Sequence, residues 1–487
     1  MSCLLLFELL SGLYLKVYTG QNFSAATTDI TGINTDSRTV HKGQIFAAIK
    51  GYRQDGKDFK DEAYERGARV FLTEEIFSVK EDCAIIKCKN VRKTLAEISA
   101  KLNDNPHKKL VLIGVTGTKG KTTVAYSVSR LMSIMGVKTY CVGTLGVTDE
   151  NGDTIMHTEN TTPDSIKLFS ILSDALFRGA EAVVIEASSQ ALKDYRLYGI
   201  TFCTVVFTSL GYDHIGKCEH ASFEEYLNAK RMLFTSFGAK IAVANGDDPF
   251  CDYMTKSAEK CIKCGFSSVS DFKITKRNAK YYLNGIEISK KELTDYNAIN
   301  FSLAIAVCNN LYGFSCSELI EHLSEITLPG RMEIIEAKGR FFIIDYAHNE
   351  MSFRAVISYA RSKYDGRVIV VYGSVGDRCS KRRKALARVA EQLADFSVIT
   401  SDDSVFEDPA EICAEIYSYY TEKAKAEIVT DREAAIYRAF SISERGDTIL
   451  LLGKGHERYI KSRSGVKHFS EPKIIDNIKN IAPDTEP

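Results

Sequence analysis

The sequence lacks several features that mark specialised protein classes. Its 63 Lys and Arg residues balance 63 Asp and Glu residues, so nothing favours a general nucleic-acid or membrane-surface binder. It has no low-complexity segment and no uninterrupted apolar run long enough to span a bilayer. The apolar start, residues 1–15, carries Glu8 and has no basic n-region. We therefore expect a short amphipathic helix there rather than a signal peptide, and no membrane insertion.

The cysteines lack the arrangement of a disulfide framework or a zinc site. The 13 cysteines are odd in number and scattered, which suggests reduced thiols and a cytoplasmic location. Cys261 and Cys264 form one C-x-x-C pair without a second pair nearby. We prefer a chance pair near a strand to a metal or redox site. We also expect a monomer.

What the sequence does contain is a repeated alternation of apolar strands and helical patterns. This alternation predicts a doubly wound α/β fold, and the length of 487 residues suggests roughly three domains. We expect a small N-terminal α/β domain over 1–108. A central, mostly parallel sheet of the phosphate-loop type should follow over 109–328, and a C-terminal Rossmann-like domain over 329–487. Functional residues should lie at the carboxyl ends of the strands.

One stretch predicts nucleotide binding. The apolar strand Leu110–Val115 runs into a Gly- and Lys-rich turn, and a helical pattern follows from Val124. Backbone N–H groups and a helix dipole converge on phosphate in such a turn, where Lys121 would reach the outer phosphates and Thr122 would face Mg²⁺. The alternative, a tight turn without a ligand, is less favoured. The loop residues are Thr116, Gly117, Thr118, Lys119, Gly120, Lys121, Thr122 and Thr123.

The spacing of this loop departs from the strict Walker pattern. That pattern would place glycine at position 115, but Val115 stands there and the glycines are Gly114 and Gly117. Glu186 directly follows the apolar run 182–185, where its carboxylate could join Thr122 in an octahedral Mg²⁺ site. The alternative for Glu186 is a solvated strand end.

Four other polar residues are ambiguous from the pattern alone. His214 is more simply a structural histidine, and Lys230 is more simply a solvated helix lysine. Arg331 and Arg378 stand in Gly-flanked loops after strands and are candidate phosphate contacts, because guanidinium binds oxyanions as a fork. Taken singly, each arginine is more simply a surface residue.

In their order along the chain, these motifs resemble those of the Mur ligase family, and specifically its MurE type. The resemblance includes the unusual loop spacing, Leu328–Glu333, Asp345–His348 and Gly453–Glu457, and it covers nearly the whole chain. It implies an ATP-dependent ligase of peptidoglycan precursor synthesis. Such an enzyme adds a diamino acid to UDP-N-acetylmuramoyl-L-alanyl-D-glutamate through an acyl phosphate, with two Mg²⁺ ions.

The resemblance also implies roles for individual residues. Besides the loop, the residues implied for ATP are Asn297, Asn300, Arg331 and Asp345. Those implied for the UDP-muramoyl substrate are Ser37, Asn160, Thr161, Thr162, Ser188 and Arg196. Those implied for the amino acid are Arg378, Asp402, Asp403, Val405, Gly453 and Glu457. The implied metal ligands are Thr122, Glu186, His214 and Lys230, the last as a carbamate; Lys121, Lys230 and His214 would be catalytic.

The chain departs from the family at several positions. Gln190 replaces a usual His, Asp194 stands where some relatives use Gln, and Glu350 stands where a Pro is frequent. Val405 occupies the position of the Arg that would bind the distal carboxylate of meso-diaminopimelate. Without that Arg the carboxylate would meet acidic residues, so we expect L-lysine or L-ornithine in preference to meso-diaminopimelate. Arg378 or a neighbouring Arg could still compensate.

Two alternatives remain open. A MurE-like amide ligase recruited to another pathway would explain the altered positions. A non-catalytic nucleotide-binding regulator with a phosphate loop is the other. The presence of the predicted catalytic and metal-binding residues argues against the regulator; they are Lys121, Glu186, His214, Lys230 and Asp345.

Overall fold

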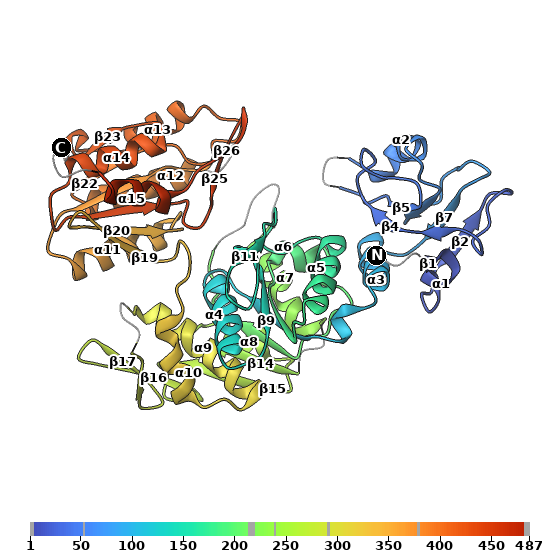
Figure 1. The fold of residues 1–487 in the computed structure, drawn as a ribbon, viewed down its shortest axis with the longest axis horizontal. Helices are drawn as coiled ribbons and strands as arrows, with labels where there is room; N and C mark the ends of the chain where they lie inside the picture. Colours follow the sequence, from blue (N-terminus) through green and yellow to red (C-terminus); the bar gives the residue numbers. More distant parts are fainter. Residues whose placement is uncertain are drawn as a thin grey trace. The chain divides into compact units, whose positions relative to one another are not determined.

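The computed structural model describes residues 4–51, 54–212, 220–237, 240–289, 293–376 and 380–481, without the side chains of 380 and 381. The chain divides into two compact units, a first unit of Met1–Ile326 and a second unit of Thr327–Pro487 (Figure 1). The boundary predicted after residue 108 lies inside the first unit. The three predicted domain ranges therefore remain a prediction.

The first part of the first unit is a five-stranded sheet in the order β2-β7-β6-β5-β4. Four of its strands are parallel, and β2 pairs antiparallel with β7 at the edge. The apolar start of the chain forms a short pairing of β1 with β3 and then helix α1, whose Leu6 and Leu9 are buried. The elements are β1 (Leu4–Leu5), α1 (Leu6–Leu10), β2 (Lys16–Thr19), β3 (Asp29–Ile30), β4 (Gly32–Asn34), β5 (Gln44–Ala47), η1 (Gly56–Phe59), α2 (Lys60–Glu65), β6 (Val70–Thr73), β7 (Ala84–Lys87) and α3 (Val91–Leu102).

The rest of the first unit is built on an 11-stranded sheet in the order β11-β10-β9-β12-β8-β13-β14-β15-β16-β17-β18. The strands from β9 to β16 in this order are parallel, and antiparallel strands extend both edges. The strands are β8 (Val111–Thr116), β9 (Thr139–Gly143), β10 (Gly146–Thr148), β11 (Thr154–Met156), β12 (Ala182–Glu186), β13 (Thr204–Phe207), β14 (Ile241–Asn245), β15 (Lys260–Gly265), β16 (Phe272–Arg277), β17 (Lys280–Leu283) and β18 (Ile286–Glu287).

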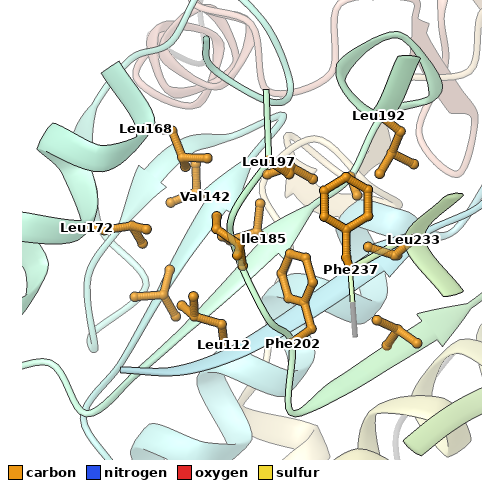
Figure 2. Packing of buried hydrophobic residues seen from close by; sticks show 14 of the residues in the cluster. Leu112, Val142, Leu168, Leu172, Ile185, Leu192, Leu197, Phe202, Leu233 and Phe237 are labelled. Atoms are coloured by element: carbon orange, nitrogen blue, oxygen red, sulfur yellow. The ribbon is translucent and has the colours of Figure 1, made fainter. Parts of the chain in front are cut away.

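Helices cover both faces of this sheet, as the doubly wound prediction requires. Leu112, Val142 and Ile185 from three neighbouring strands pack with Phe202, and with residues of α5, α6 and α7, in one core (Figure 2). Full burial of such side chains stabilises the fold by about 1.5–3 kcal/mol each. The helical elements here are η2 (Pro106–Lys108), α4 (Lys121–Ile134), α5 (Ser165–Phe177), α6 (Ser189–Lys193), α7 (Phe223–Thr235), α8 (Cys251–Thr255), α9 (Asp295–Tyr312), α10 (Cys316–His322) and η3 (Leu323–Glu325).

The second unit has a six-stranded sheet in the order β19-β20-β24-β21-β22-β23, parallel except for β19. Residues of β21 alternate between two cores, since Val368 and Val370 pack beneath α11, α12 and α13 while Ile369 packs beneath α14 and α15. The elements are β19 (Glu333–Ala337), β20 (Arg340–Asp345), α11 (Glu350–Lys363), β21 (Val368–Tyr372), α12 (Ser380–Leu393), β22 (Phe396–Ile399), α13 (Pro409–Ser418), η4 (Lys423–Lys425), β23 (Ala426–Ile428), α14 (Arg432–Ile442), β24 (Thr448–Leu452), β25 (Tyr459–Ser462), β26 (Gly465–His468) and α15 (Glu471–Lys479).

The predicted α/β fold is confirmed, and Cys261 and Cys264, expected near a strand, lie within one. Both lie in β15 three positions apart, so their side chains point to opposite faces of the sheet and do not form one metal site. None of the helices in the described ranges is long and apolar enough to cross a membrane.

Candidate active site

The loop between β8 and α4 requires glycine at two positions. Gly117 has a φ of +154° and Gly120 a φ of +86°, a region that favours glycine. A Cβ atom on Gly117 would lie 2.0 Å from the Thr208 hydroxyl oxygen, and one on Gly120 would lie 2.5 Å from the Asn300 side-chain oxygen. Both backbone conformation and space therefore fix these glycines, and the bare backbone can approach an anion closely.

Two lysines meet at one carbonyl of this loop. Lys121, the first residue of α4, donates from Nζ to the carbonyl oxygen of Gly117 over 2.9 Å. Lys230 on α7 donates from Nζ to the same oxygen over 2.7 Å and lies 4.6 Å from the centre of the Tyr226 ring. Since Lys230 is 1% exposed, the interpretation of a solvated helix lysine is wrong. Two lysine side chains thus meet at the turn where phosphate oxygens would approach, and one of them is the lysine predicted to carry a carbamate.

Glu186, at the end of β12, gathers oxygen atoms beside the loop. Its Oε2 accepts hydrogen bonds from the hydroxyls of Thr122 over 3.0 Å and Thr144 over 3.1 Å, and its Oε1 accepts from the Thr144 backbone N–H over 2.8 Å. Glu186 is 1% exposed, so the alternative of a solvated strand end is wrong. Carboxylate and hydroxyl oxygens are the ligands that Mg²⁺ prefers, and the residues present fit that ion.

Other residues of the nucleotide prediction lie around the same loop. The Thr116 hydroxyl donates to the Ala187 carbonyl and is buried, and the Lys119 backbone N–H donates to the Ser209 hydroxyl. Asn300 on α9 is buried beside Gly120, and its Nδ2 has no hydrogen-bond partner among the described residues. A buried donor of this kind is available to a ligand. Asn297 and Thr123 are half-buried.

Tyr226 connects α7 to the loop, and the sequence analysis missed it. Its hydroxyl lies 2.9 Å from the Thr118 hydroxyl, and Thr118 Oγ1 also accepts from the Gly211 backbone N–H over 2.9 Å. Tyr226 and Lys230 are four residues apart and therefore share one face of α7. That spacing, followed by an apolar run, was the signal available in the sequence.

Most residues predicted for the UDP-muramoyl substrate form a network that reaches Glu186. Thr162 donates from its hydroxyl to the Glu186 carbonyl and accepts from the Ser188 backbone N–H over 3.0 Å. Arg196 donates to the Thr162 carbonyl over 2.8 Å, and the Thr161 hydroxyl lies 3.3 Å from that of Thr144. These contacts bring the four residues together.

Asn160 and Ser37 belong to other surroundings. Asn160 is exposed, and its described contact is a carbonyl that accepts from the Thr158 hydroxyl. Ser37, in the N-terminal part of the first unit, donates from its hydroxyl to Glu62 over 2.5 Å.

In the second unit, Asp345 holds two loops at the end of β20. Its carboxylate accepts from the backbone N–H groups of Met332 over 2.8 Å and Ala347 over 2.7 Å. Burial raises the pKa of Asp345, and the nearby Arg331 works in the opposite direction. The Arg331 guanidinium lies 4.7 Å from the centre of the Tyr346 ring, which holds it by a cation–π contact.

Asp402, Asp403 and Glu457 surround the ammonium group of Lys454, and we call these four residues the acidic cluster. Lys454 Nζ lies 2.8 Å from Asp403 Oδ1, 2.6 Å from Glu457 Oε2 and 3.7 Å from Asp402 Oδ1. Burial works to lower the pKa of Lys454, but the three carboxylates outweigh it and raise the pKa. Burial raises the pKa of Glu457, against the effect of Lys454. The three carboxylates are close enough to hold a metal ion, but the ammonium group already takes that place.

Val405 lies beside the acidic cluster in a strained conformation. Its φ is +54°, which is unusual for a β-branched residue. Its backbone N–H points to the carbonyl of Lys461 in β25, and the Lys461 backbone N–H donates to Asp403. Gly453, at the end of β24, has a φ of +110°, and a Cβ there would lie 2.8 Å from Asp402 Oδ2.

Two further predicted site residues, His214 and Arg378, lie outside the described residues.

Comparison with known proteins decides the family. Residues 115–312 match the Mur ligase middle domain, residues 330–455 match the Mur ligase glutamate ligase domain, and residues 29–105 match the Mur ligase family catalytic domain. The UDP-N-acetylmuramoyl-L-alanyl-D-glutamate--2,6-diaminopimelate ligase of Aquifex aeolicus (strain VF5) is 34% identical over 92% of this chain and 93% of its own. The chain belongs to the Mur ligase family. It is therefore an ATP-dependent ligase that forms amide bonds.

Further relatives of this Mur ligase cover almost its full length. A protein of the same name from Clostridium perfringens (strain 13 / Type A) is 32% identical over 98% of this chain and 99% of its own. A solved structure of a ligase with that name matches with a TM-score of 0.68 and 26% identity, over 98% of this chain and 99% of the other. MurF from Acinetobacter baumannii, at 18% identity and a TM-score of 0.63 over 99% of this chain and 100% of its own, shares the fold.

Two positions at which this Mur ligase departs from the expected pattern are bonded to each other. The Gln190 side-chain amide donates to Asp194 Oδ2 over 3.0 Å. Asp194 also lies 3.7 Å from Arg92 of α3 and 3.5 Å from Arg196. Gln190 and Asp194 are four residues apart across α6, so a helical spacing rule could have found the pair.

Proposed function

We propose that this Mur ligase joins a diamino acid to UDP-N-acetylmuramoyl-L-alanyl-D-glutamate in peptidoglycan precursor synthesis. The observation that carries the proposal is the similarity over more than nine-tenths of the chain to relatives named for ligation to that nucleotide. The geometry supports it, because the phosphate loop and Glu186 suit a nucleotide triphosphate and its metal. A cytoplasmic location and a monomeric state remain predictions.

In the proposed reaction, the glutamate carboxylate attacks the outer phosphorus of ATP, an acyl phosphate forms, and ADP leaves. The amine of the amino acid then attacks the acyl carbon, and phosphate leaves as the amide bond forms. Lys121 would stabilise the charge on the transferred phosphoryl group, since it lies at the first turn of α4. Asn300 and Asn297 would lie on the adenine side. The family resemblance also implies that Arg331 and Asp345 serve ATP.

Two Mg²⁺ ions would neutralise negative charge between the phosphates and the carboxylate. Thr122 and Glu186 supply the oxygen atoms for one ion. A carbamate on Lys230, together with His214, would serve the other. Carbamoylation would turn the buried amine of Lys230 into a carboxylate on a long arm, which is a metal ligand where an ammonium group is not.

The acidic cluster supports a distal ammonium rather than a distal carboxylate on the incoming amino acid. Three carboxylates and one ammonium sum to a charge of −2 when all four groups are ionised, and Val405 adds no positive charge. A second carboxylate on the ligand would be repelled there, whereas an ammonium would be attracted. We therefore propose L-lysine or L-ornithine, although the named relatives are 2,6-diaminopimelate ligases.

Product identification by mass spectrometry tests both parts of the proposal. The purified chain would be incubated with ATP, Mg²⁺, UDP-N-acetylmuramoyl-L-alanyl-D-glutamate and an equimolar mixture of L-lysine, L-ornithine and meso-diaminopimelate. We expect the lysine or ornithine product. A product with meso-diaminopimelate alone would overturn the selectivity and keep the function. If no amino acid were added, the function itself would be wrong.

A Mur-type amide ligase recruited to another pathway is the second candidate, favoured by the Gln190–Asp194 pair beside the substrate residues. A thermal-shift titration separates the two candidates. UDP-N-acetylmuramoyl-L-alanyl-D-glutamate should raise the melting temperature if that nucleotide is the substrate. Absence of a shift at saturating concentration would favour recruitment.

A further inference from the structure

Arg432 and Glu471 form a fully buried ion pair directly behind the acidic cluster. Arg432 NH2 lies 2.8 Å from Glu471 Oε1, Arg432 Nε donates to the same oxygen over 3.0 Å, and both side chains are 0% exposed. Arg432 is the first residue of α14 and Glu471 the first residue of α15, on the face of the sheet that both helices cover. Neither residue was singled out in the sequence.

The Arg432 guanidinium also joins the ends of two strands that are not neighbours. It donates to the carbonyl of Leu452, the last residue of β24, over 2.8 Å and to that of Ser401, just beyond β22, over 3.4 Å. In the sheet, β21 lies between β24 and β22, so no backbone ladder links these two strand ends directly. The planar fork of arginine can reach both carbonyls at once.

The residues held in this way lead directly into the acidic cluster. Asp402 follows Ser401, and Lys454 stands two residues after Leu452. The charge of Glu471 also acts on Lys454 and Asp402. The distance between the two strand ends therefore sets how the Lys454 ammonium meets the Asp402 and Asp403 carboxylates.

Local preferences do not explain why a charged pair is buried here. Glutamate suits the N-terminus of a helix, but the positive charge of arginine at the first position of α14 is opposed by the helix dipole. A buried ion pair is also often no more stable than apolar side chains of the same volume. Glu471 Oε2 has no hydrogen-bond partner among the described residues, so the pair is not optimised for stability alone.

We propose that Arg432 and Glu471 are positioning residues, which hold the ends of β22 and β24 at the separation that the amino-acid substrate requires. The inference rests on the proposed function for its substrate, and on the contacts above for its geometry. Arg432 acts through the backbone of Ser401 and Leu452 rather than by touching the amino acid.

The test replaces the pair by apolar side chains and follows two readouts. In the double variant Arg432→Met/Glu471→Met neither charge is left alone in the core, so folding should be retained. We expect the KM for the amino acid to rise about tenfold with little change in the KM for ATP, as expected when a binding group is misplaced. Arg432→Lys should show the same rise, because it keeps the charge and loses the fork.

Arg340→Met is the matched control, because Arg340 is also buried and also donates to carbonyls, but at the start of β20 rather than at the carboxyl end of a strand. It contacts the carbonyls of Lys338 over 2.7 Å and Ser443 over 3.1 Å. This variant should leave the KM for the amino acid unchanged. If Arg432 had a purely structural role, the Arg432 variants and Arg340→Met would behave alike. Each would have a lower melting temperature, and none would show a selective rise in the KM for the amino acid.

Hydrogen–deuterium exchange separates failure of this inference from failure of the proposed function. In the double variant, exchange should increase in peptides covering 400–405 and 452–458 and remain unchanged in 333–345. If the wild type adds no amino acid but these peptides exchange faster, the function is wrong and the positioning role stands. Unchanged exchange in both peptides, or an unchanged KM for the amino acid in an active enzyme, would overturn the inference.

Discussion

The two units of this Mur ligase use lysine in opposite ways. At the phosphate loop, Lys121 and Lys230 both donate to the neutral backbone carbonyl of Gly117. In the second unit, Lys454 is surrounded by three carboxylates at 2.6 to 3.7 Å. The Gly117 carbonyl carries no net charge for a lysine to neutralise, whereas the carboxylates around Lys454 carry negative charge that its ammonium group offsets. Under the proposed function, Lys121 would meet the phosphates of ATP, and the net negative charge of the acidic cluster would meet a cationic amino acid.

The largest effect should come from Lys121→Ala. In the proposed reaction this ammonium group would stabilise the transferred phosphoryl group, so its loss should lower kcat by about 10³-fold. Circular dichroism of the variant, compared with the wild type, checks that the fold is retained. A steady-state assay of phosphate release gives the rate.

Lys138→Ala is the control for that variant, since Lys138 lies at the surface of the same unit and pairs with Glu150 over 2.8 Å. It should keep full activity. Full function of Lys121→Ala in cells that depend on this gene product would instead support a nucleotide-binding regulator.

Lys454→Ala should act on stability as much as on activity. It leaves the three carboxylates of the acidic cluster without their counter-charge in a buried place, which should cost about 3 kcal/mol of unfolding free energy. Chemical denaturation of the full chain, in which the unfolding transition of the second unit is followed, measures this loss of free energy. The exposed Lys467 is the matched control, and Lys467→Ala should change the unfolding free energy by less than about 0.5 kcal/mol. Equal stability of the two variants would show that Lys454 is not the counter-charge.

Val405→Arg should shift the choice of amino acid. A guanidinium beside the acidic cluster would attract a distal carboxylate, so the ratio of kcat/KM for meso-diaminopimelate over L-lysine should rise about tenfold. Val405→Leu serves as the control, since it adds no charge at the same strained backbone position. If both variants gave the wild-type ratio, position 405 would not select the substrate.

The difference between the two units also explains what the sequence could predict. The phosphate loop is local: an apolar strand, two glycines and a helix start are adjacent in the chain, and Glu186 ends the strand that pairs next to β8. Short-range sequence patterns were therefore sufficient to predict the phosphate loop and the position of Glu186. The extension of the central sheet by β15 to β18 was not predicted, because β15, β16 and β17 carry Lys residues within their apolar patterns and β17 and β18 are short.

The acidic cluster depends on partners distant in the sequence. Lys454 and Asp403 are 51 residues apart, and Arg432 and Glu471 are 39 apart. The sequence motif Gly453–Glu457 contains Lys454 between two glycines, but no neighbouring residue in the sequence indicates that the Lys454 ammonium group is buried among carboxylates. Partner choice of this kind follows from the strand order, which the alternation of elements does not fix.

The smallest effect concerns the pH dependence of stability, which should differ between the units. In the second unit, burial raises the pKa of Asp345, Glu457 and Glu471, against the effects of Arg331, Lys454 and Arg432. Carboxyls with raised pKa values take up protons first in the folded state. The second unit should therefore gain stability as the pH falls from 7 toward the ordinary carboxyl pKa of about 4.

In the first unit, His107 should make stability decrease as the pH falls, which is opposite to the change expected in the second unit. Its ring packs edge-on against Phe169 with ring centres 5.3 Å apart, and burial lowers its pKa below the ordinary value of 6.5. As the pH falls below that value, the unfolded chain takes up the proton first, so the first unit should lose stability. We expect its melting temperature to fall by about 2 °C between pH 7 and pH 5 relative to His107→Phe, measured by scanning calorimetry. An equal response in wild type and His107→Phe would contradict this assignment, and the second unit serves as an internal control because the substitution lies outside it.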